Sequence, residues 1–245
     1  MTTSDSRAAS PGFPWGLTVL SGLVLVLLLA LGVWQVQRLQ WKQGLIAQAD
    51  LAAGLPPVPI QQIEPGPDRQ FRQVIVDCPG LATAPFVELQ SIRDGEAGVR
   101  LISACPVEAG PGQPTPGVYL VDRGFMSAEV SARPSVGRDS RPVRIIAVVR
   151  TAPAPGLMAL PPSGNSFYAR DNAAMAAALG VSTLVSAETL FATTSSNPDM
   201  ATLQPSAPPV AFANNHLGYA LTWFGLAGAL IAFYVVLLRR RMRGG

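Results

Sequence analysis

Two long apolar segments without charged residues lie near the ends of the chain, and a mixed polar sequence lies between them. Residues 16–34 have the sequence GLTVLSGLVLVLLLALGVW, and residues 217–238 have the sequence LGYALTWFGLAGALIAFYVVLL. At about 1.5 Å per residue, each segment covers most or all of a bilayer core of about 30 Å. An apolar segment alone in lipid satisfies its backbone polar groups only as a helix. The pattern therefore predicts transmembrane helices over residues 15–36 and 215–238.

The first segment has a second interpretation, a cleaved signal peptide, because residues 30–32 (Ala-Leu-Gly) resemble a small-x-small cleavage site. Against it, only Arg7 provides positive charge before the segment, and Trp34 and Trp41 lie where an interfacial aromatic belt would lie. We therefore favour an uncleaved anchor. Asp5 and the lack of repeated arginines argue against a mitochondrial transit peptide, which indicates a bacterial protein.

The arginine-rich C-terminal tail predicts the orientation of the protein. Residues 239–245 contain four arginines, and basic residues next to a span favour the cytoplasmic side. Two spans then place the N-terminal tail, residues 1–14, in the cytoplasm and residues 37–214 in the periplasm. Arg38 and Lys42 lie on the disfavoured outer side of the first span, but four arginines outweigh two basic residues. The predicted fold class is a bacterial inner-membrane protein with N- and C-terminal transmembrane helices flanking one extracytoplasmic β-rich α+β domain.

Residues 35–50 are predicted to continue the first helix beyond its span. Trp34, Arg38 and the pair Trp41/Lys42 recur at i, i+4 and i+7/i+8, so they lie on one helix face. One interpretation is interfacial anchoring, in which the long basic side chains extend to the lipid headgroups. The other is a docking surface at the membrane face. Taken alone, the spacing favours anchoring.

Composition supports a membrane protein with one central domain. Only 13% of the 245 residues are charged, against about 25% in an ordinary soluble domain. About 180 residues remain between the spans, which is enough for one domain with its own core. The formal net charge of +3 comes largely from the basic tail, so it gives no indication of nucleic-acid binding.

The central region is predicted to consist mainly of short strands separated by turns, such as Gly-Pro-Gly at residues 110–112. One short helix is predicted over residues 172–179, with Asp171 as its N-cap and Gly180 at its C′ position. Residues 193–209 are predicted to be a loop that returns the chain to the membrane. The β-branched runs that predict strands are residues 71–76, 99–104, 118–125 and 141–149.

The two cysteines, Cys78 and Cys105, are too far apart for a C-x-x-C redox pair or a C-x-x-C-H haem attachment site. In an oxidising periplasm they could form a structural disulfide. Each also lies in or beside a predicted strand and precedes a proline, so two buried thiols are the alternative. A shared copper site is not expected, because no Met or His ligands cluster with them.

His216 is the only histidine, and it lies at the outer mouth of the second span. A single histidine excludes multi-histidine metal sites and is a poor basis for a catalytic triad, so no catalytic residue and no enzyme activity are predicted. His216, Tyr219 or Ala220, and Trp223 fall on one helix face. They suit either an ordinary membrane interface or axial ligation of haem iron by the neutral imidazole. In the same helix, the spacing of Gly225 and Ala229 would let another helix approach closely.

Four short motifs occur along the chain, and the two spans flank them. They are LGVWQVQR at residues 31–38 with Trp41-Lys42 and residues 45–46, VDRGF at 121–125, FYARD at 167–171, and NNHLGYALTWFGL at 214–226. Together and in this order they resemble the motifs of the Surfeit locus protein 1 family of cytochrome c oxidase assembly factors. The resemblance covers nearly the whole chain, and the last motif is the most specific.

The resemblance implies a factor that helps to mature subunit I of aa3-type haem-copper oxidases by binding haem a transiently and delivering it. The expected partners are then subunit I, haem A synthase and membrane lipid, and the expected cofactor is haem a. His216 matches the histidine proposed as the haem axial ligand in bacterial members of the family, with Tyr219 and Trp223 beside it. No metal other than the haem iron is expected. The alternative is a structural scaffold that bridges subunit I and haem A synthase without binding haem.

The resemblance also implies roles for motif residues outside the haem site. Arg38 and Lys42 become candidates for docking or for pairing with haem propionates. Arg123 and Gly124 are expected to serve the fold or a partner surface. The motif residues assigned to a partner or membrane face are Trp34, Gln35, Arg38, Trp41, Lys42, Arg123 and Gly124.

Overall fold

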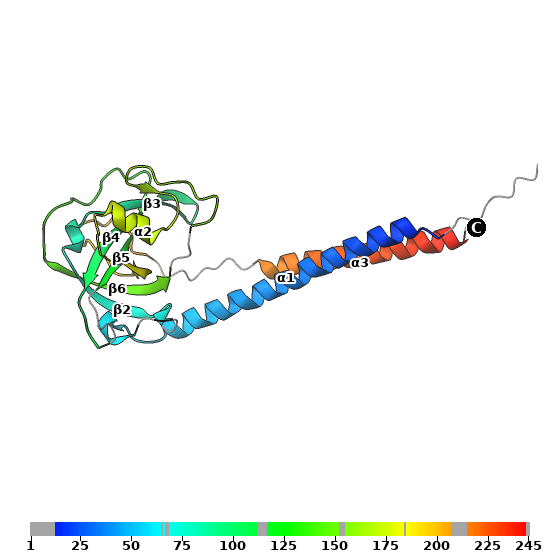
Figure 1. Ribbon diagram of the computed structural model, residues 1–245, viewed down its shortest axis with the longest axis horizontal. Helices are drawn as coiled ribbons and strands as arrows, with labels where there is room; N and C mark the ends of the chain where they lie inside the picture. Colours follow the sequence, from blue (N-terminus) through cyan, green and yellow to red (C-terminus); the bar gives the residue numbers. More distant parts are fainter. Residues whose placement is uncertain are drawn as a thin grey trace, which may run out of the picture. The chain divides into compact units, whose positions relative to one another are not determined.

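The structure is a computed structural model that contains two compact units (Figure 1). One unit comprises Met1–Ile46 and Ala211–Gly245 and contains the two long helices, and the other, Ala47–Val210, contains a β-sheet. The residues described are 13–64, 66, 69–111, 117–151, 155–183, 185–206 and 215–243. Most of the predicted N-terminal tail, the end of the C-terminal tail, Gly112 and residues 207–214 lie outside the described residues.

The two predicted spans lie within helices α1 (Trp15–Ala53) and α3 (His216–Arg243). Both helices are long and apolar enough to cross a membrane, and their lipid-facing leucines, valines and phenylalanines are largely exposed. α1 continues through Ala53 without a break, as predicted for residues 35–50. The chain is therefore a membrane protein with two transmembrane helices that flank a central β-rich domain.

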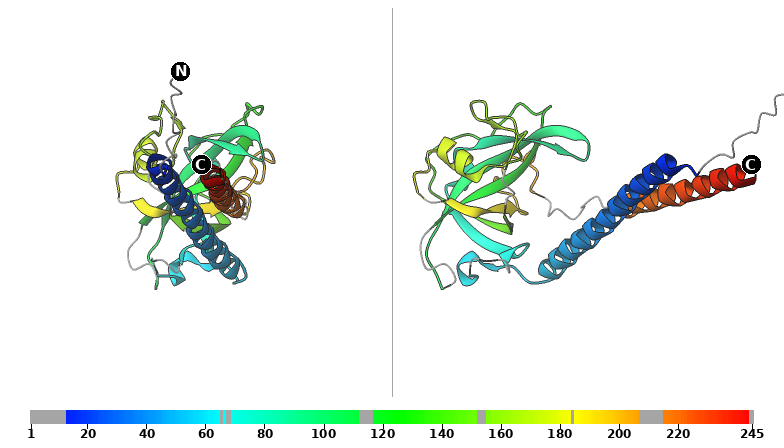
Figure 2. Two further views of the ribbon diagram at one scale, coloured as in Figure 1. Left: turned by 90° about the vertical axis from the view of Figure 1, so that its right-hand side faces the viewer. Right: turned by 45° about the vertical axis from the view of Figure 1, so that its right-hand side comes forward.

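The helices α1 and α3 pack side by side and antiparallel (Figures 1 and 2). Thr18 Oγ1 on α1 lies 2.6 Å from Tyr234 Oη on α3, and Gly32 lies against the Phe224 ring. A Cβ at Gly32 would approach the ring to 2.6 Å, so this glycine allows the close contact. The buried or half-buried positions recur every three or four residues on each helix, namely Thr18, Ser21, Leu25, Leu28, Gly32 and Gln35 on α1, and His216, Ala220, Trp223, Ala227, Leu230 and Tyr234 on α3.

Gly225 and Ala229 are not the residues at which α1 and α3 meet, so their predicted contact with another helix stays a prediction. Both residues are exposed, and the buried small residues of α3 are Ala220 and Ala227. The spacing of seven residues between them returns to the same face after two helical turns, whereas Gly225 faces away from that stripe.

The central unit is built on one mixed eight-stranded sheet with the strand order β1-β2-β6-β8-β5-β4-β3-β7. Most neighbouring pairs are antiparallel, and the parallel pairs are β1 with β2, β5 with β8, and β3 with β7. The bounds are β1 Val58–Pro59, β2 Gln73–Pro79, β3 Val87–Arg93, β4 Glu96–Val107, β5 Gly117–Ser127, β6 Pro142–Thr151, β7 Ser166–Phe167 and β8 Val185–Ala192, with 3-10 turns η1 Ile60–Gln62 and η3 Leu81–Thr83.

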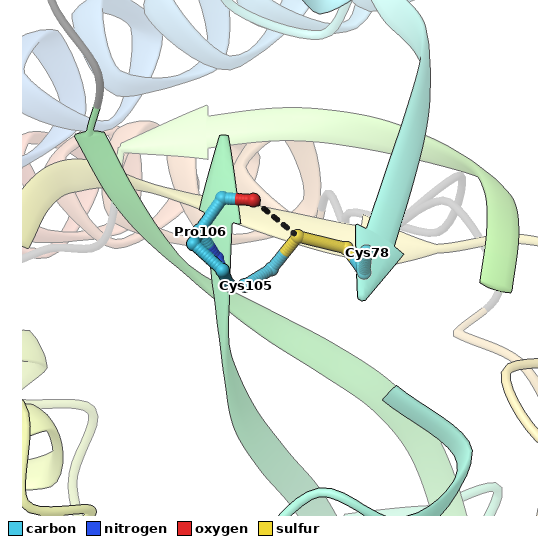
Figure 3. Close-up of a disulfide and its surroundings, with 3 residues drawn as sticks. All are labelled: Cys78, Cys105 and Pro106. Atoms are coloured by element: carbon cyan, nitrogen blue, oxygen red, sulfur yellow. Dashed lines mark hydrogen bonds between the residues drawn. A yellow bond between two sulfur atoms is a disulfide. The ribbon is translucent and has the colours of Figure 1, made fainter. Parts of the chain in front are cut away.

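A disulfide across the interior shows how strongly the sheet curls. Cys78 of β2 and Cys105 of β4 are bonded, with their Cα atoms 5.3 Å apart, although three strands separate β2 from β4 in the sheet order (Figure 3). Alternate residues of β2, β4, β5, β6 and β8 fill the enclosed core around it, among them Val76, Tyr119 and Leu190. The alternative of two buried thiols is therefore not what the structure contains.

The opposite face of the sheet carries a second apolar cluster beneath the short helix α2 (Asn172–Ala178). Met175 and Ala176 of this helix pack on Leu120 and Ile102 of the sheet. Asp171 caps the helix by accepting a hydrogen bond from the Ala174 N–H at 3.0 Å, and Gly180 has a φ of 73° after its end. The predicted cap, helix and C′ glycine are thus confirmed.

The strand predictions were incomplete: the two-residue strands β1 and β7, the strands β3 and β8, and the correct start of β2 were not predicted. Phe71 has a φ of 65°, which interrupts an extended strand, so β2 begins at Gln73 rather than at residue 71. β3 was not predicted, although Asp94 and Gly95 form the two-residue turn, both at positive φ, that joins it to β4. β8 was not predicted either, and it lies in the middle of the sheet between β5 and β6.

Removing the disulfide should destabilise the central domain. A cross-link between residues 27 positions apart restricts the unfolded chain, and we expect Cys78→Ala/Cys105→Ala to lose about 2–4 kcal/mol of free energy of unfolding. All four tryptophans of the chain lie in α1 and α3, so tryptophan fluorescence does not follow this domain. Pulse proteolysis of the full-length protein in detergent, at increasing urea concentration, instead measures the urea concentration at the midpoint of unfolding of this domain.

Reducing the wild type with dithiothreitol is the matched control for this variant. Reduction should lower the urea midpoint of the wild type by a similar amount and should leave the double variant unchanged. Equal midpoints for the oxidised wild type, the reduced wild type and the double variant would contradict a stabilising role for the disulfide.

Candidate functional site

The only histidine of the chain is hydrogen-bonded to the opposite helix of the pair. His216 is the first residue of α3, and its Nδ1 lies 2.7 Å from Oε1 of Gln35 on α1. Gln35 is 9% exposed and the His216 ring is half-buried, so the contact lies within the seam between the helices. The ring nitrogen Nε2 has no hydrogen-bond partner among the described residues. Among the described residues, one ring nitrogen is therefore engaged by Gln35 and the other is left for a ligand.

The residues next to His216 offer an aromatic surface. Tyr219, one turn along α3, is 56% exposed, and Trp223 is half-buried on the stripe that faces α1. An imidazole with one nitrogen held and the other open, next to an exposed aromatic ring, fits a single axial bond to the iron of a flat, largely apolar haem. The described residues contain no cluster of three or more His, Cys, Asp or Glu side chains that could hold another metal ion.

Trp34, Arg38 and Trp41 lie on the exposed face of α1, whereas Lys42 does not. Trp34 and Trp41 are 53% and 50% exposed, and the guanidinium carbon of Arg38 lies 3.8 Å from the centre of the Trp41 ring. Lys42 is half-buried on the stripe that continues from Gln35. Gln35 therefore turns into the helix seam, whereas its motif neighbours Trp34 and Arg38 point outward.

A second polar centre lies in the sheet domain around the buried carboxylate of Asp122 on β5. Its Oδ2 accepts hydrogen bonds from Arg100 Nε and Arg170 Nη2, each at 2.7 Å. Its Oδ1 accepts from the Ser206 hydroxyl at 2.8 Å and the Gly124 N–H at 3.2 Å. This one carboxylate thus ties β4, β5, the segment before α2 and the segment after β8 together.

The charge balance of this centre favours an ionised Asp122. Burial acts to raise the pKa of the Asp122 carboxyl, but the positive charges of Arg170 and Arg100, with the hydrogen bonds of Arg100 and Ser206, outweigh it. The pKa of Asp122 therefore lies below its usual value. Phe191 lies in the same layer, with the Arg170 guanidinium carbon 4.7 Å from its ring centre.

Arg123 and Gly124 are buried and make contacts within the domain. The Arg123 guanidinium donates to Ser196 Oγ, Ser103 Oγ and the Ala82 carbonyl at 3.1–3.5 Å. Burial lowers the pKa of Arg123 to about 10, so the group is still charged at neutral pH. Gly124 has a φ of 133°, and a Cβ there would lie 2.1 Å from the Gln204 carbonyl oxygen. These placements favour a role in the fold over a partner surface.

The four sequence motifs come together in two pairs. Gln35 of the first motif meets His216 of the last one, and Asp122 of the second motif meets Arg170 of the third. The motifs contained all four residues, but the partners are 181 and 48 positions apart, so spacing gave no signal for the contacts. Arg100 lies outside the motifs and was not predicted.

Replacing Asp122 should destabilise the domain through its arginines. In Asp122→Asn, Arg100 and Arg170 lose their buried counter-charge, and we expect a loss of about 3–5 kcal/mol of free energy of unfolding. Because the pKa of Asp122 is lowered on folding, its stabilisation is complete above the unfolded value of about 3.9 and is lost as the pH falls through the folded value. The wild type should therefore lose stability more steeply below pH 4 than the variant.

Pulse proteolysis of full-length protein, with an acid-active protease at low pH, measures both effects. Asp77→Asn is the matched control, because Asp77 pairs with Arg144 at the surface, where both side chains are at least half exposed. It should change the midpoint at neutral pH only slightly. A similar loss for the two variants would contradict the central role of Asp122.

Comparison with known proteins agrees with the arrangement of spans and motifs. The sequence model of the SURF1 family matches residues 22–228 of this chain, a range that includes all four motifs. Surfeit locus protein 1 of Mus musculus is 29% identical over 223 residues, covering 81% of this chain and 68% of that protein. Surfeit locus protein 1 of Homo sapiens is 28% identical over 84% of this chain and 72% of its own length, and the SURF1-like protein of Drosophila melanogaster is 28% identical over 81% and 70%. The chain belongs to the SURF1 family.

Proposed function

We propose that this protein assists the maturation of subunit I of an aa3-type haem-copper cytochrome c oxidase by binding haem a transiently and delivering it. Membership of the SURF1 family, whose members act in the assembly of cytochrome c oxidase, supports the oxidase as its target. The observation that carries the haem part is the His216 imidazole, which Gln35 holds through Nδ1 and whose Nε2 has no partner in the described part of the chain.

The chain's own residues have distinct tasks in this proposal. His216 provides the axial nitrogen, and Tyr219 with Trp223 provides aromatic surface for one face of the macrocycle. Arg38 and Lys42 lie on α1 beyond Gln35, where their charges suit the propionates of a bound haem or the acidic surface of a partner. The protein supplies one ligand and releases its cargo, and we propose no catalytic step and no enzyme activity.

The expected location follows from the two spans. We place the protein in the bacterial inner membrane, with its basic tail in the cytoplasm and its disulfide-bonded domain in the periplasm, where disulfides persist. Haem A synthase and subunit I, which release and receive haem a, are the partners in this proposal, and lipid surrounds the helix pair.

A scaffold that bridges subunit I and haem A synthase without binding haem is the second candidate function. It is favoured by the outer face of α1, where the exposed Trp34 and the stacked pair of Arg38 and Trp41 form a surface suited to docking. In this case His216 and Gln35 would serve only to hold the helices together.

Haem binding by purified protein separates these two functions. Full-length wild type, co-expressed with a haem A-producing pathway and purified in detergent, should show the absorption spectrum of bound haem a. His216→Ala should lower the bound haem at least about tenfold, because it removes the iron ligand. The readout is the haem content per protein together with the visible spectrum.

Asn215→Ala is the matched control, since Asn215 is the exposed neighbour of His216. It should bind haem a as the wild type does. If neither the wild type nor any variant carries haem a, while oxidase assembly still depends on this protein, haem delivery is refuted and the scaffold is supported.

A further inference from the structure

We propose that Gln35 is a positioning residue that holds the His216 ring in its Nδ1–H tautomer and so presents the lone pair of Nε2. The tautomer assignment stands on the geometry alone. Only its use, ligation of haem iron by Nε2, rests on the proposed function.

The assignment follows from which atoms can donate. Oε1 of Gln35 is an amide oxygen and can only accept a hydrogen bond, so Nδ1 of His216 must donate across the 2.7 Å that separates them. A neutral imidazole carries one N–H, and the nitrogen without it keeps a lone pair. With the proton on Nδ1, Nε2 is therefore the nitrogen able to bind a metal.

Gln35 is well placed for this task because the helix pair fixes it. It follows Gly32 by one turn on the buried stripe of α1, and Gly32 is where the Phe224 ring of α3 comes closest. Gln35 as a whole is 9% exposed, so little water competes for the imidazole N–H. The ring of His216 is thus set by a residue of the other helix.

A neutral amide also suits a ligand that must let its cargo go. Histidines that hold a metal permanently often donate to a carboxylate, which increases the electron-donating strength of the ring. An amide oxygen orients the ring in the same way without a negative charge. We therefore infer that Gln35 orients His216 for binding while keeping the bond to iron weak enough for transfer.

The alternative is that the hydrogen bond only ties α1 to α3. In that case the Gln35 side chain would contribute to helix packing, and neither the tautomer of His216 nor the release of haem would depend on it.

Nitrogen NMR of the haem-free protein tests the tautomer directly. Because His216 is the only histidine, ¹⁵N-histidine labelling of the full-length protein in detergent gives signals from a single ring. At a pH where the ring is neutral, we expect a protonated Nδ1 and an unprotonated Nε2 in the wild type. Gln35→Leu should lose this pattern, Gln35→Glu should keep it by retaining an acceptor oxygen, and Gln40→Leu, an exposed glutamine on the same helix, should not change it.

Haem release provides the second readout. Gln35→Leu should weaken haem a binding by roughly 10- to 100-fold, as loss of a partner to a ligating histidine does. Gln35→Glu should instead slow the transfer of haem a from the loaded protein to an apo-haem acceptor protein, and Gln40→Leu should match the wild type in both measurements.

The outcomes separate this inference from the proposed function. A wild type protonated on Nε2, or an unchanged ring pattern and haem affinity in Gln35→Leu, would overturn the positioning role even if His216 binds haem a. A wild type with the proton on Nδ1 that binds no haem a would refute the proposed function and support the tautomer assignment.

Discussion

The close packing of α1 against α3 is the constraint on which the candidate site depends. Lipid gives two apolar helices no hydrophobic reason to associate, so small residues and interhelical hydrogen bonds must hold them. Gly32 admits the Phe224 ring, and hydrogen bonds at Thr18–Tyr234 and Gln35–His216 lie toward opposite ends of the pair. Because His216 is oriented by the second of these bonds, the geometry of its ring is a property of the pair and not of either helix alone.

The sheet domain uses the same strategy of joining distant segments through few polar contacts. Asp122 connects four segments through its two oxygens, and the disulfide joins two strands that are not neighbours in the sheet. Arg123 is buried nearby with only neutral acceptors among the described residues, which adds a cost that the surrounding fold must offset. The domain therefore depends on a few specific contacts as well as on its apolar core.

What the sequence could predict depended on how local each signal was. The spans, the Asp171 cap and strands β4, β5 and β6 have signals within their own residues, and all were predicted. β3 had a local signal in Asp94-Gly95, whereas β8 contains Ser, Ala and Glu and is specified mainly by strands on both sides. For the site, the motifs contained His216 and Gln35, but a contact across 181 positions exists only in the folded chain. The Cys78–Cys105 pairing was likewise open, because only the curl of the sheet brings the two strands together.

The distance in sequence between Gln35 and His216 also determines when, during synthesis of the chain, the site can form. Synthesis runs from the N-terminus, so Gln35 enters the membrane long before its partner, and α3 is the last helix to follow. A chain that stops before residue 216 lacks the imidazole, so the Gln35 amide oxygen has no N–H from His216 to accept. The site thus forms only after the whole β-domain has been synthesised. A formed site therefore indicates that the chain extends through its second span.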